Sequence, residues 1–472
     1  MRIPLLIVTV AMCAAAGQAA EAPDSTRYLR ENVGTSWPQY SSTAQTSTAS
    51  EARWWQRFDD PLLDSLITVG LANNYDVIMA TRRIDIARAQ LGQARAGYYP
   101  TVGISAGYTK GRQSGDMYGA GGSPTKMSYF SLGATMSWEI DVFGRVRANV
   151  DAGRKRVKLS RAERAGVKVS LEAEIATAYV HLRVLQAQLD VADRHSRSQH
   201  KALKIAEARF DTGLASMLDV DQARQVYFST IASIPMLRSQ IHNAVNSIAT
   251  LLVTTPGELR PVLDPLRPMP GYLQLVAAGV PMDLLRHRPD VVEAEEQIGL
   301  CASELGIAKK DWLPKLVLEG SVGTDAHRAG DLFTNRSFTY SIAPTLSWTV
   351  FDGMARKYNI AQARQEMENA IDNYNFTVVT AVNEVDDALS TYFSSLKYIS
   401  ALEDVVKASS EYDSRSLDNY KNGLSPFINV ANAQMSYLEN MNTLIVAKGD
   451  ALDALIALYK ALGGGWIDDE LR

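Results

Sequence analysis

The sequence predicts a membrane protein of mixed α and β structure, in which a unit of two strands and two long helices occurs twice. Three observations support this prediction: an internal repeat, four segments in which apolar and polar residues alternate, and two pairs of very long helical patterns. The chain has 472 residues, of which 46% are hydrophobic and 21% charged, so it is long and apolar enough to fold. Its net charge of −4 gives no reason to expect a nucleic-acid partner.

The N-terminus has the pattern of an export signal over residues 1–19. A basic start precedes an apolar stretch from Ile3 to Ala16, and small residues lie just before a cut after Ala19. The alternative is lipidation of Cys13, because the residues from Val10 to Cys13 resemble a bacterial lipoprotein cleavage site. No later stretch offers about 18 uninterrupted apolar residues, as a spanning helix requires. The exported protein is therefore either free outside the inner membrane or crosses the outer membrane as a β-barrel.

Residue pairs at a nearly constant separation reveal the two copies. Gly213 pairs with Gly423 and Trp138 with Trp348, each 210 positions apart, whereas Asp76 pairs with Asp290 and Pro100 with Pro314, each 214 apart. The first copy therefore has four additional residues between Pro100 and Ser137, in a Gly- and Ser-rich stretch that is typical of a loop.

These offsets divide the chain into six parts: a signal (1–19), an extended N-terminal segment (20–58), a first repeat (59–253), a Pro-rich linker (254–274), a second repeat (275–462) and a C-terminal tail (463–472). The prolines of the linker favour a semi-extended conformation and argue against a helix there.

Alternation of apolar and polar residues predicts strands at about 101–111, 128–140, 315–325 and 336–350. In the first strand, Val102, Ile104, Ala106 and Tyr108 would face one side and small or polar residues the other. Each segment is as long as a tilted strand that crosses a membrane, and four strands of a soluble sandwich are the alternative.

Four strands are too few to close a barrel in a membrane. The smallest spanning barrels have about eight strands, and an open edge in lipid leaves backbone groups unpaired. Several chains must therefore share one barrel if these strands span the membrane. Three chains would supply twelve strands, although this argument alone does not choose three over two or four.

Two long helical patterns follow each strand pair, which predicts helices at 145–211 and 215–253 in the first copy and at 355–421 and 425–462 in the second. The first could extend over about 100 Å at 1.5 Å per residue. Apolar residues recur at steps of three and four, as in Ile175, Ala178 and Leu182, so the helices should pair as coiled coils. A soluble coiled-coil scaffold would explain these helices but not the amphipathic strands.

Residues that commonly catalyse reactions or bind metals form no convincing cluster in the sequence. His195 and His200 are five positions apart and do not share a helix face, and Cys301 is expected to be a packed core thiol. The charged cluster from Arg286 to Asp290 fits an ion pair at a helix start. No nucleophile elbow or phosphate loop is present. We therefore predict that the protein is not an enzyme and has no catalytic residue, cofactor or metal.

The sequence resembles the TolC/OprM family of outer-membrane efflux proteins over nearly its whole mature length. WWQRFDDPLLDSLITVGLANNYDV resembles the family's first helices, and ARAGYYPTVGISAGYT and SWEIDVFGRVR resemble its first strand pair. GVPMDLLRHRPDVVEAE (Gly279–Glu295) is similar to the opening of its second repeat, and LSWTVFDG resembles its fourth strand.

The resemblance implies a homotrimer with a twelve-stranded β-barrel in outer-membrane lipid, continuous with an α-helical coiled-coil tunnel in the periplasm. It also implies two protein partners, a periplasmic adaptor (membrane fusion) protein and an inner-membrane pump of the RND type.

The resemblance further places function at the tips of the helical hairpins. It implies that adaptor hairpins dock at the two turns, at Gly213, Leu214, Ser216, Gly423, Leu424 and Ser425. It also implies a periplasmic gate at Asp219, Tyr420, Asn429 and Asn432. The two asparagines depart from the family, which has acidic residues there, and a ring of amides would bind cations less strongly than a ring of carboxylates.

The expected function is that of a passive exit duct in a tripartite efflux or type I-like export system, which carries drugs or other small molecules and is opened by adaptor and pump. The alternative is a trimeric coiled-coil structural or adhesive surface protein without transport. In the duct, the helices lie in the periplasm and the strand-connecting loops, near 111–126 and 325–336, face outside. A periplasmic hydrolase would require a catalytic cluster that the sequence does not show.

Overall fold

The structure, a computed structural model, describes residues 53–114, 125–271 and 288–464. The expected signal, with Cys13 and Ala19, lies outside the described residues. Among the described residues, one compact unit comprises 89–114, 125–155 and 297–371, and the other comprises 53–88, 156–271, 288–296 and 372–464. None of the described helices has a stretch long and apolar enough to cross a membrane.

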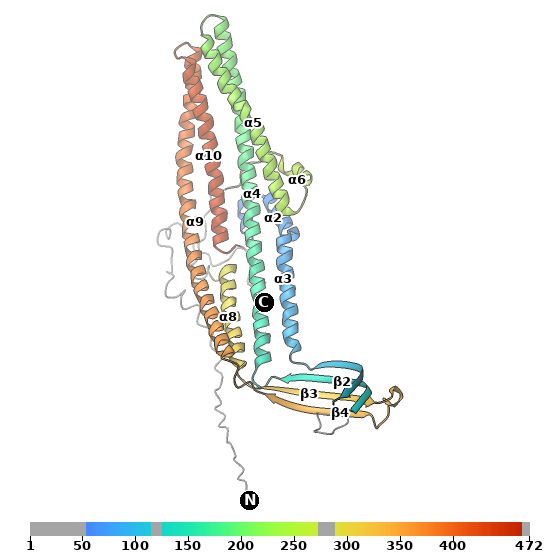
Figure 1. Cartoon of the computed structure of the whole chain (residues 1–472). Coiled ribbons are helices and arrows are strands. Elements are labelled where there is room, and N and C mark those ends of the chain that lie inside the picture. The colour runs from blue at the N-terminus through green and yellow to red at the C-terminus, as the bar shows by residue number, and fades with distance from the viewer. Residues whose placement is uncertain (1–52, 115–124, 272–287, 465–472) are drawn as a thin grey trace. The chain divides into compact units, whose positions relative to one another are not determined.

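The first unit contains an antiparallel sheet whose strands follow the order of the chain (Figure 1). The strands are β1 (Thr101–Gln113), β2 (Thr125–Ile140), β3 (Lys315–Ala326) and β4 (Phe338–Ser347), and a short 3-10 helix, η3 (Ala329–Asp331), follows β3. All four alternating segments of the sequence therefore form strands. The sheet joins the two copies, because β2 of the first pairs with β3 of the second.

The register aligns side chains of one kind into rows across the sheet. One row consists of Ile104, Ala134, Val322 and Tyr340, and the row on the opposite face consists of Gly103, Thr135, Ser321 and Ser341. The apolar face predicted from the sequence is therefore confirmed. Ile104 is 82% exposed and Tyr340 is 74% exposed, so nothing in the described chain covers the ends of the apolar row.

Equivalent tryptophans fix the sheet in the same way in both copies. The indole Nε1 of Trp138 donates to the carbonyl of Tyr98 at 3.1 Å, and that of Trp348 donates to the carbonyl of Trp312 at 3.0 Å. Each bond ties the end of the second strand of a pair to the chain just before the first strand. The repeat read from the sequence thus corresponds to a repeated contact.

The helices also recur in matched pairs. α3 (Tyr75–Ala96) and α8 (Pro289–Lys310) each have 22 residues, and α4 (Arg145–Asp211) and α9 (Ala355–Lys421) each have 67. The return helices are α5 (Met217–Leu252) and α10 (Phe427–Ala461), and α2 (Pro61–Asn73) precedes α3. α4 and α9 begin and end at the predicted residues. The hairpins α4–α5 and α9–α10 lie side by side (Figure 1).

The core of the second unit lies where the two hairpins pack together. Ile175 and Leu182 of the predicted α4 seam are fully buried among residues of α5, α9 and α10. Burial extends beyond that seam, because Tyr179, Val180 and Arg183 of α4 are also buried. The sequence predicted that these helices pair, whereas this part of α4 packs into a core with several helices.

Two expectations for the segments that flank the repeats are wrong. Trp54–Phe58, expected to be extended, forms a 3-10 helix (η1), and Trp54 is buried and stacks on Tyr459 with ring centroids 5.2 Å apart. Burial of these large rings outweighs the local preference for an extended chain. The linker, expected to exclude a helix, contains α6 (Pro256–Leu263).

Two features explain why α6 tolerates its prolines. Pro256 lies in the first turn, where a missing N–H costs no helical bond, and a helix of eight residues loses only one bond to Pro261. The carbonyl of Leu263 at the end of α6 then accepts from Gln186 Nε2 at 2.7 Å, and the carbonyl of Pro265 accepts from Arg183 at 3.1 Å. Buried polar groups of α4 therefore hold the linker in place.

Candidate functional site: the hairpin tips

The two hairpins turn through the same backbone motif. In the first turn, the N–H of Gly213 donates to the carbonyl of Phe210 at 2.9 Å, and that of Leu214 donates to the carbonyl of Arg209 at 2.8 Å. Gly423 and Leu424 make the corresponding bonds in the second turn. Both glycines have a positive φ, 74° and 73°, which residues with a Cβ adopt at a cost. The glycine spacing in the sequence therefore identified both turns.

The structure brings together two of the predicted gate residues, Asp219 and Tyr420. The Tyr420 hydroxyl lies 3.4 Å from Asp219 Oδ2, so it links the start of α5 to the end of α9. The ring of Tyr420 is 2% exposed and meets Phe427 edge to face. Burial and the nearby Asp219 carboxylate raise the pKa of Tyr420, so the hydroxyl keeps its proton and donates.

A third residue at this contact, Arg209, was not predicted from the sequence. Its guanidinium lies over the Tyr420 ring at 5.0 Å, donates to the carbonyl of Lys421 at 2.6 Å and donates to the carbonyl of Leu214 at 3.3 Å. Arg209 therefore holds both turns at once. The signal that could have found it is the basic residue in the last turn of α4, where a cation meets free carbonyls.

The structure does not bring the other two predicted gate residues to this contact. Asn429 is exposed, and its side-chain nitrogen donates to Ser425 Oγ at 2.8 Å. Asn432 is also exposed, and both asparagines lie on α10. Neither side chain carries a charge, so this hairpin presents amides at the two predicted gate positions where the family has carboxylates.

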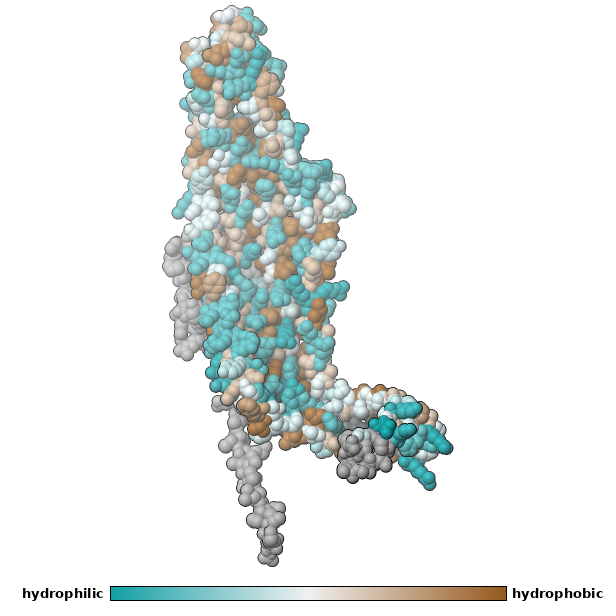
Figure 2. Space-filling model, viewed as in Figure 1, coloured by the Kyte–Doolittle hydropathy of each residue, from teal (hydrophilic) through white to brown (hydrophobic). Residues whose placement is uncertain are grey.

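The predicted adaptor positions are largely exposed at the tips. Leu214 is 67% exposed and Leu424 is 76% exposed, and each follows the glycine of its turn. Ser216 caps α5 with its hydroxyl, which accepts from the N–H of Asp219 at 3.4 Å. Hydrophobic and hydrophilic side chains mix at this end of the visible face (Figure 2).

Residues considered for chemistry have structural partners instead. Arg288 is buried and pairs with Asp290 and Glu384, each at 2.7 Å, which confirms an ion pair at the start of α8. His195 contacts the ring of Tyr437. Cys301 is buried, as predicted. Among the residues that the structure describes, no group of three or more His, Cys, Asp or Glu could hold a metal ion.

Comparison with known proteins shows similarity over almost the whole chain. The family model described as "Outer membrane efflux protein" matches residues 66–253 and 280–464, so it matches each copy separately. The antibiotic efflux pump outer membrane protein ArpC of Pseudomonas putida is 28% identical over 456 residues, which cover 96% of this chain and 92% of ArpC. The outer membrane protein OprJ of Pseudomonas aeruginosa is 27% identical over 92% of this chain and 90% of its own.

Solved structures share the fold. The outer-membrane channel OprN superposes with a TM-score of 0.86 at 27% identity, over 92% of this chain and 97% of OprN. VceC of Vibrio cholerae superposes with a TM-score of 0.81 at 25% identity, over 89% of this chain and 100% of VceC. With the family model matched over both copies, the chain belongs to the outer membrane efflux protein family and is an outer-membrane channel through which efflux substrates leave the cell.

Proposed function

We propose that three copies of this chain form the exit duct of a tripartite efflux system. One observation supports a barrel that several copies share: a four-stranded sheet with an exposed apolar face, in which β1 and β4 each pair on one side only within the described chain. In lipid, the free edges of β1 and β4 must be paired. Pairing β4 of each copy with β1 of the next closes a barrel of twelve strands.

In this proposal the helical hairpins extend into the periplasm, and their tips form the closed end of the duct. Asp219 and Tyr420, with Arg209, hold the tips of the two hairpins together, and Asn429 and Asn432 line the narrowest part. A periplasmic adaptor docks at the turns through Gly213, Leu214 and Ser216 in one hairpin and Gly423, Leu424 and Ser425 in the other. An inner-membrane pump of the RND type supplies the energy, because the duct performs no chemistry.

Cysteine labelling in intact cells tests the topology. In a Cys301→Ser background, Gly330→Cys places a thiol in the exposed loop between β3 and β4, and Asn422→Cys places one at the second turn. We expect a membrane-impermeant maleimide to label position 330 in intact cells and position 422 only after the outer membrane is permeabilised. The reverse pattern would support the coiled-coil surface protein, in which the helices lie outside the cell.

The mass of the purified protein tests the stoichiometry. We expect three chains per particle in detergent, by light scattering corrected for bound detergent. A detergent-free, soluble monomer would contradict both the shared barrel and the duct. A particle of two or four chains would contradict only the number of copies.

A further inference from the structure

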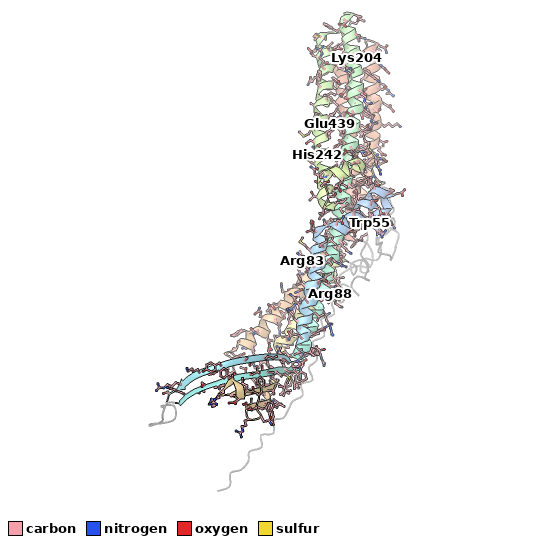
Figure 3. All side chains as sticks on the ribbon, turned by 90° about the vertical axis from the view of Figure 1, so that its right-hand side faces the viewer. Trp55, Arg83, Arg88, Lys204, His242 and Glu439 are labelled. Carbon is pink, nitrogen blue, oxygen red and sulfur yellow. The ribbon has the colours of Figure 1, made fainter. Side chains whose placement is uncertain are left out.

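A cleft of about 550 Å³ lies between α4, α5 and α10, away from the hairpin turns. Its lining residues include Gln199 of α4, Thr230 of α5, and Leu438, Glu439 and Asn442 of α10. Glu439 lies along the helices between the levels of Lys204 and His242 (Figure 3). The volume is within the range of small-molecule sites in proteins, about 300–1,000 Å³.

Polar atoms without a hydrogen-bond partner occur on two of the side chains that line this cleft. Gln199 is 2% exposed, yet neither its side-chain nitrogen nor its oxygen has a hydrogen-bond partner among the described residues. Oδ1 of Asn442 is likewise buried without a partner. Buried amide groups in folded proteins are almost always bonded, and leaving them unbonded is costly. The two side chains therefore provide unused hydrogen-bonding groups beside one cleft.

The available polar atoms are mostly hydrogen-bond acceptors. The hydroxyls of Ser229 and Thr230 already donate to the carbonyl of Val226, at 2.9 Å and 3.3 Å, so towards the cleft their oxygens can only accept. The amide oxygens of Gln199 and Asn442 also accept. The nitrogen of Gln199 is the one unused donor among the amide atoms without a partner at the cleft.

Charge and hydropathy add two further requirements for a ligand. Glu439 contributes an exposed carboxylate, and among the described lining residues there is no lysine or arginine. Met435, Leu438 and Val446 form an apolar wall beside it. A suitable ligand is therefore positively charged, rich in N–H donors and apolar over part of its surface.

We propose that this cleft binds organic cations that carry an ammonium or amidinium group on an apolar body. The cationic group donates to Glu439 and to the amide oxygens of Gln199 and Asn442, and the body packs against Leu438 and Met435. All of the residues that line the site belong to one copy of the chain.

Three isosteric probes test the proposal on the purified full-length protein in detergent by titration calorimetry. Benzamidine is a cation with N–H donors, benzamide is its neutral counterpart, and benzoate is an anion. We expect saturable binding of benzamidine, binding of benzamide weaker by about tenfold, and no binding of benzoate, because a charged hydrogen bond is worth about an order of magnitude in affinity.

Two substitutions locate the site, and one serves as a control. Glu439→Gln should weaken benzamidine binding by about fivefold, since the lost ion pair is partly solvated. Gln199→Leu should weaken it by about tenfold because it removes a buried acceptor. Glu411→Gln, which removes an exposed carboxylate of α9 that pairs with Arg415, should leave affinity unchanged.

Three results would overturn the proposal. They are the absence of saturable benzamidine binding up to its solubility limit, equal affinities for benzamidine and benzamide, and an affinity in Glu439→Gln equal to that of the unchanged protein. Equal affinities for benzamidine and benzamide would mean that the cleft recognises the phenyl ring and not the charge. Because Glu439 is exposed, its substitution should preserve the fold, and circular dichroism checks this. A failure here leaves the duct proposal intact, since the labelling experiment tests that separately.

Discussion

Arg209→Met removes the guanidinium that holds both hairpin turns while retaining an unbranched apolar side chain. Three contacts are lost: the bond of 2.6 Å to the Lys421 carbonyl, the bond of 3.3 Å to the Leu214 carbonyl and the interaction with the Tyr420 ring at 5.0 Å. The turns are exposed, so we assign about 1 kcal/mol to the short bond and about 0.5 kcal/mol each to the other two contacts. The bond to Leu214 lies within the first hairpin, so the arrangement in which the two tips are joined should lose only the other two contacts, about 1.5 kcal/mol or roughly tenfold in its equilibrium.

Single-channel recording in planar lipid bilayers measures this shift. If the joined tips are the closed state of the duct, Arg209→Met should increase open probability, and by up to about tenfold where the unchanged channel is almost always closed. Trimer yield and heat stability should change little, because the contact lies at the end of the hairpins.

Arg224→Met is the matched control for this experiment. Arg224 also lies near the tip and pairs with Glu207 at 3.3 Å, but both side chains are more than 40% exposed and both belong to the hairpin of α4 and α5. Its removal should cost less than about 1 kcal/mol and should not free one hairpin from the other. Equal open probabilities in Arg209→Met and the unchanged protein would refute the role assigned to Arg209.

Three further predictions concern the fold, and each is measured by the thermal midpoint in detergent. Burial raises the pKa of Asp453 to about 6, above the ordinary 3.8, so the folded protein binds this proton more tightly and loses stability as pH rises from 4 through 6. Asp453→Asn should remove up to about 2 kcal/mol of that loss. If the thermal midpoint of the variant depends on pH between 4 and 7 as that of the unchanged protein does, Asp453 is not responsible. Arg288→Met should destabilise by about 2–3 kcal/mol because it removes a buried guanidinium bonded to two half-exposed carboxylates and a backbone carbonyl, whereas Arg415→Met, in an exposed pair, should have no measurable effect. Gly423→Ala should destabilise the folded protein by about 1 kcal/mol, because alanine is strained at this positive φ. Gly306→Ala in α8, where a Cβ would meet no atom within 4 Å, should instead stabilise it. Equal effects of the two substitutions would contradict the turn geometry.

Local sequence signals were sufficient for the strands, the long helices and the turns. A side chain in a strand alternates sides by geometry, so the residues around Ile104 and Tyr340 reveal their faces without a partner. The left-handed conformation at Gly213 and Gly423 restricts the residue type, so the turns are visible as glycines. Local conformational preference gave the wrong structure at two places. Burial of the large rings outweighed it at Trp54, and the short length of α6 outweighed it at Pro256.

The candidate site was predicted only in part, because a gate is a set of contacts between hairpins. The sequence and its family resemblance identified Tyr420 and Asp219, which lie 201 positions apart and meet at 3.4 Å. Nothing local distinguished Arg209 from other arginines at helix ends, because its role depends on a carbonyl of α9 and a ring that only folding brings near. The cleft beside Gln199 has the same origin, since residues of three helices line it.

The sequence by itself determined which segments are strands and helices, that they occur twice, and that four strands are too few to close a barrel in lipid, because periodicity and backbone conformation are properties of neighbouring residues. Only the tertiary structure decided which side chains of different hairpins meet, how polar groups of α4 hold the linker, and which buried amides lack a partner. Those features depend on distances between residues far apart in the chain, which the spacing of residues along a sequence does not specify.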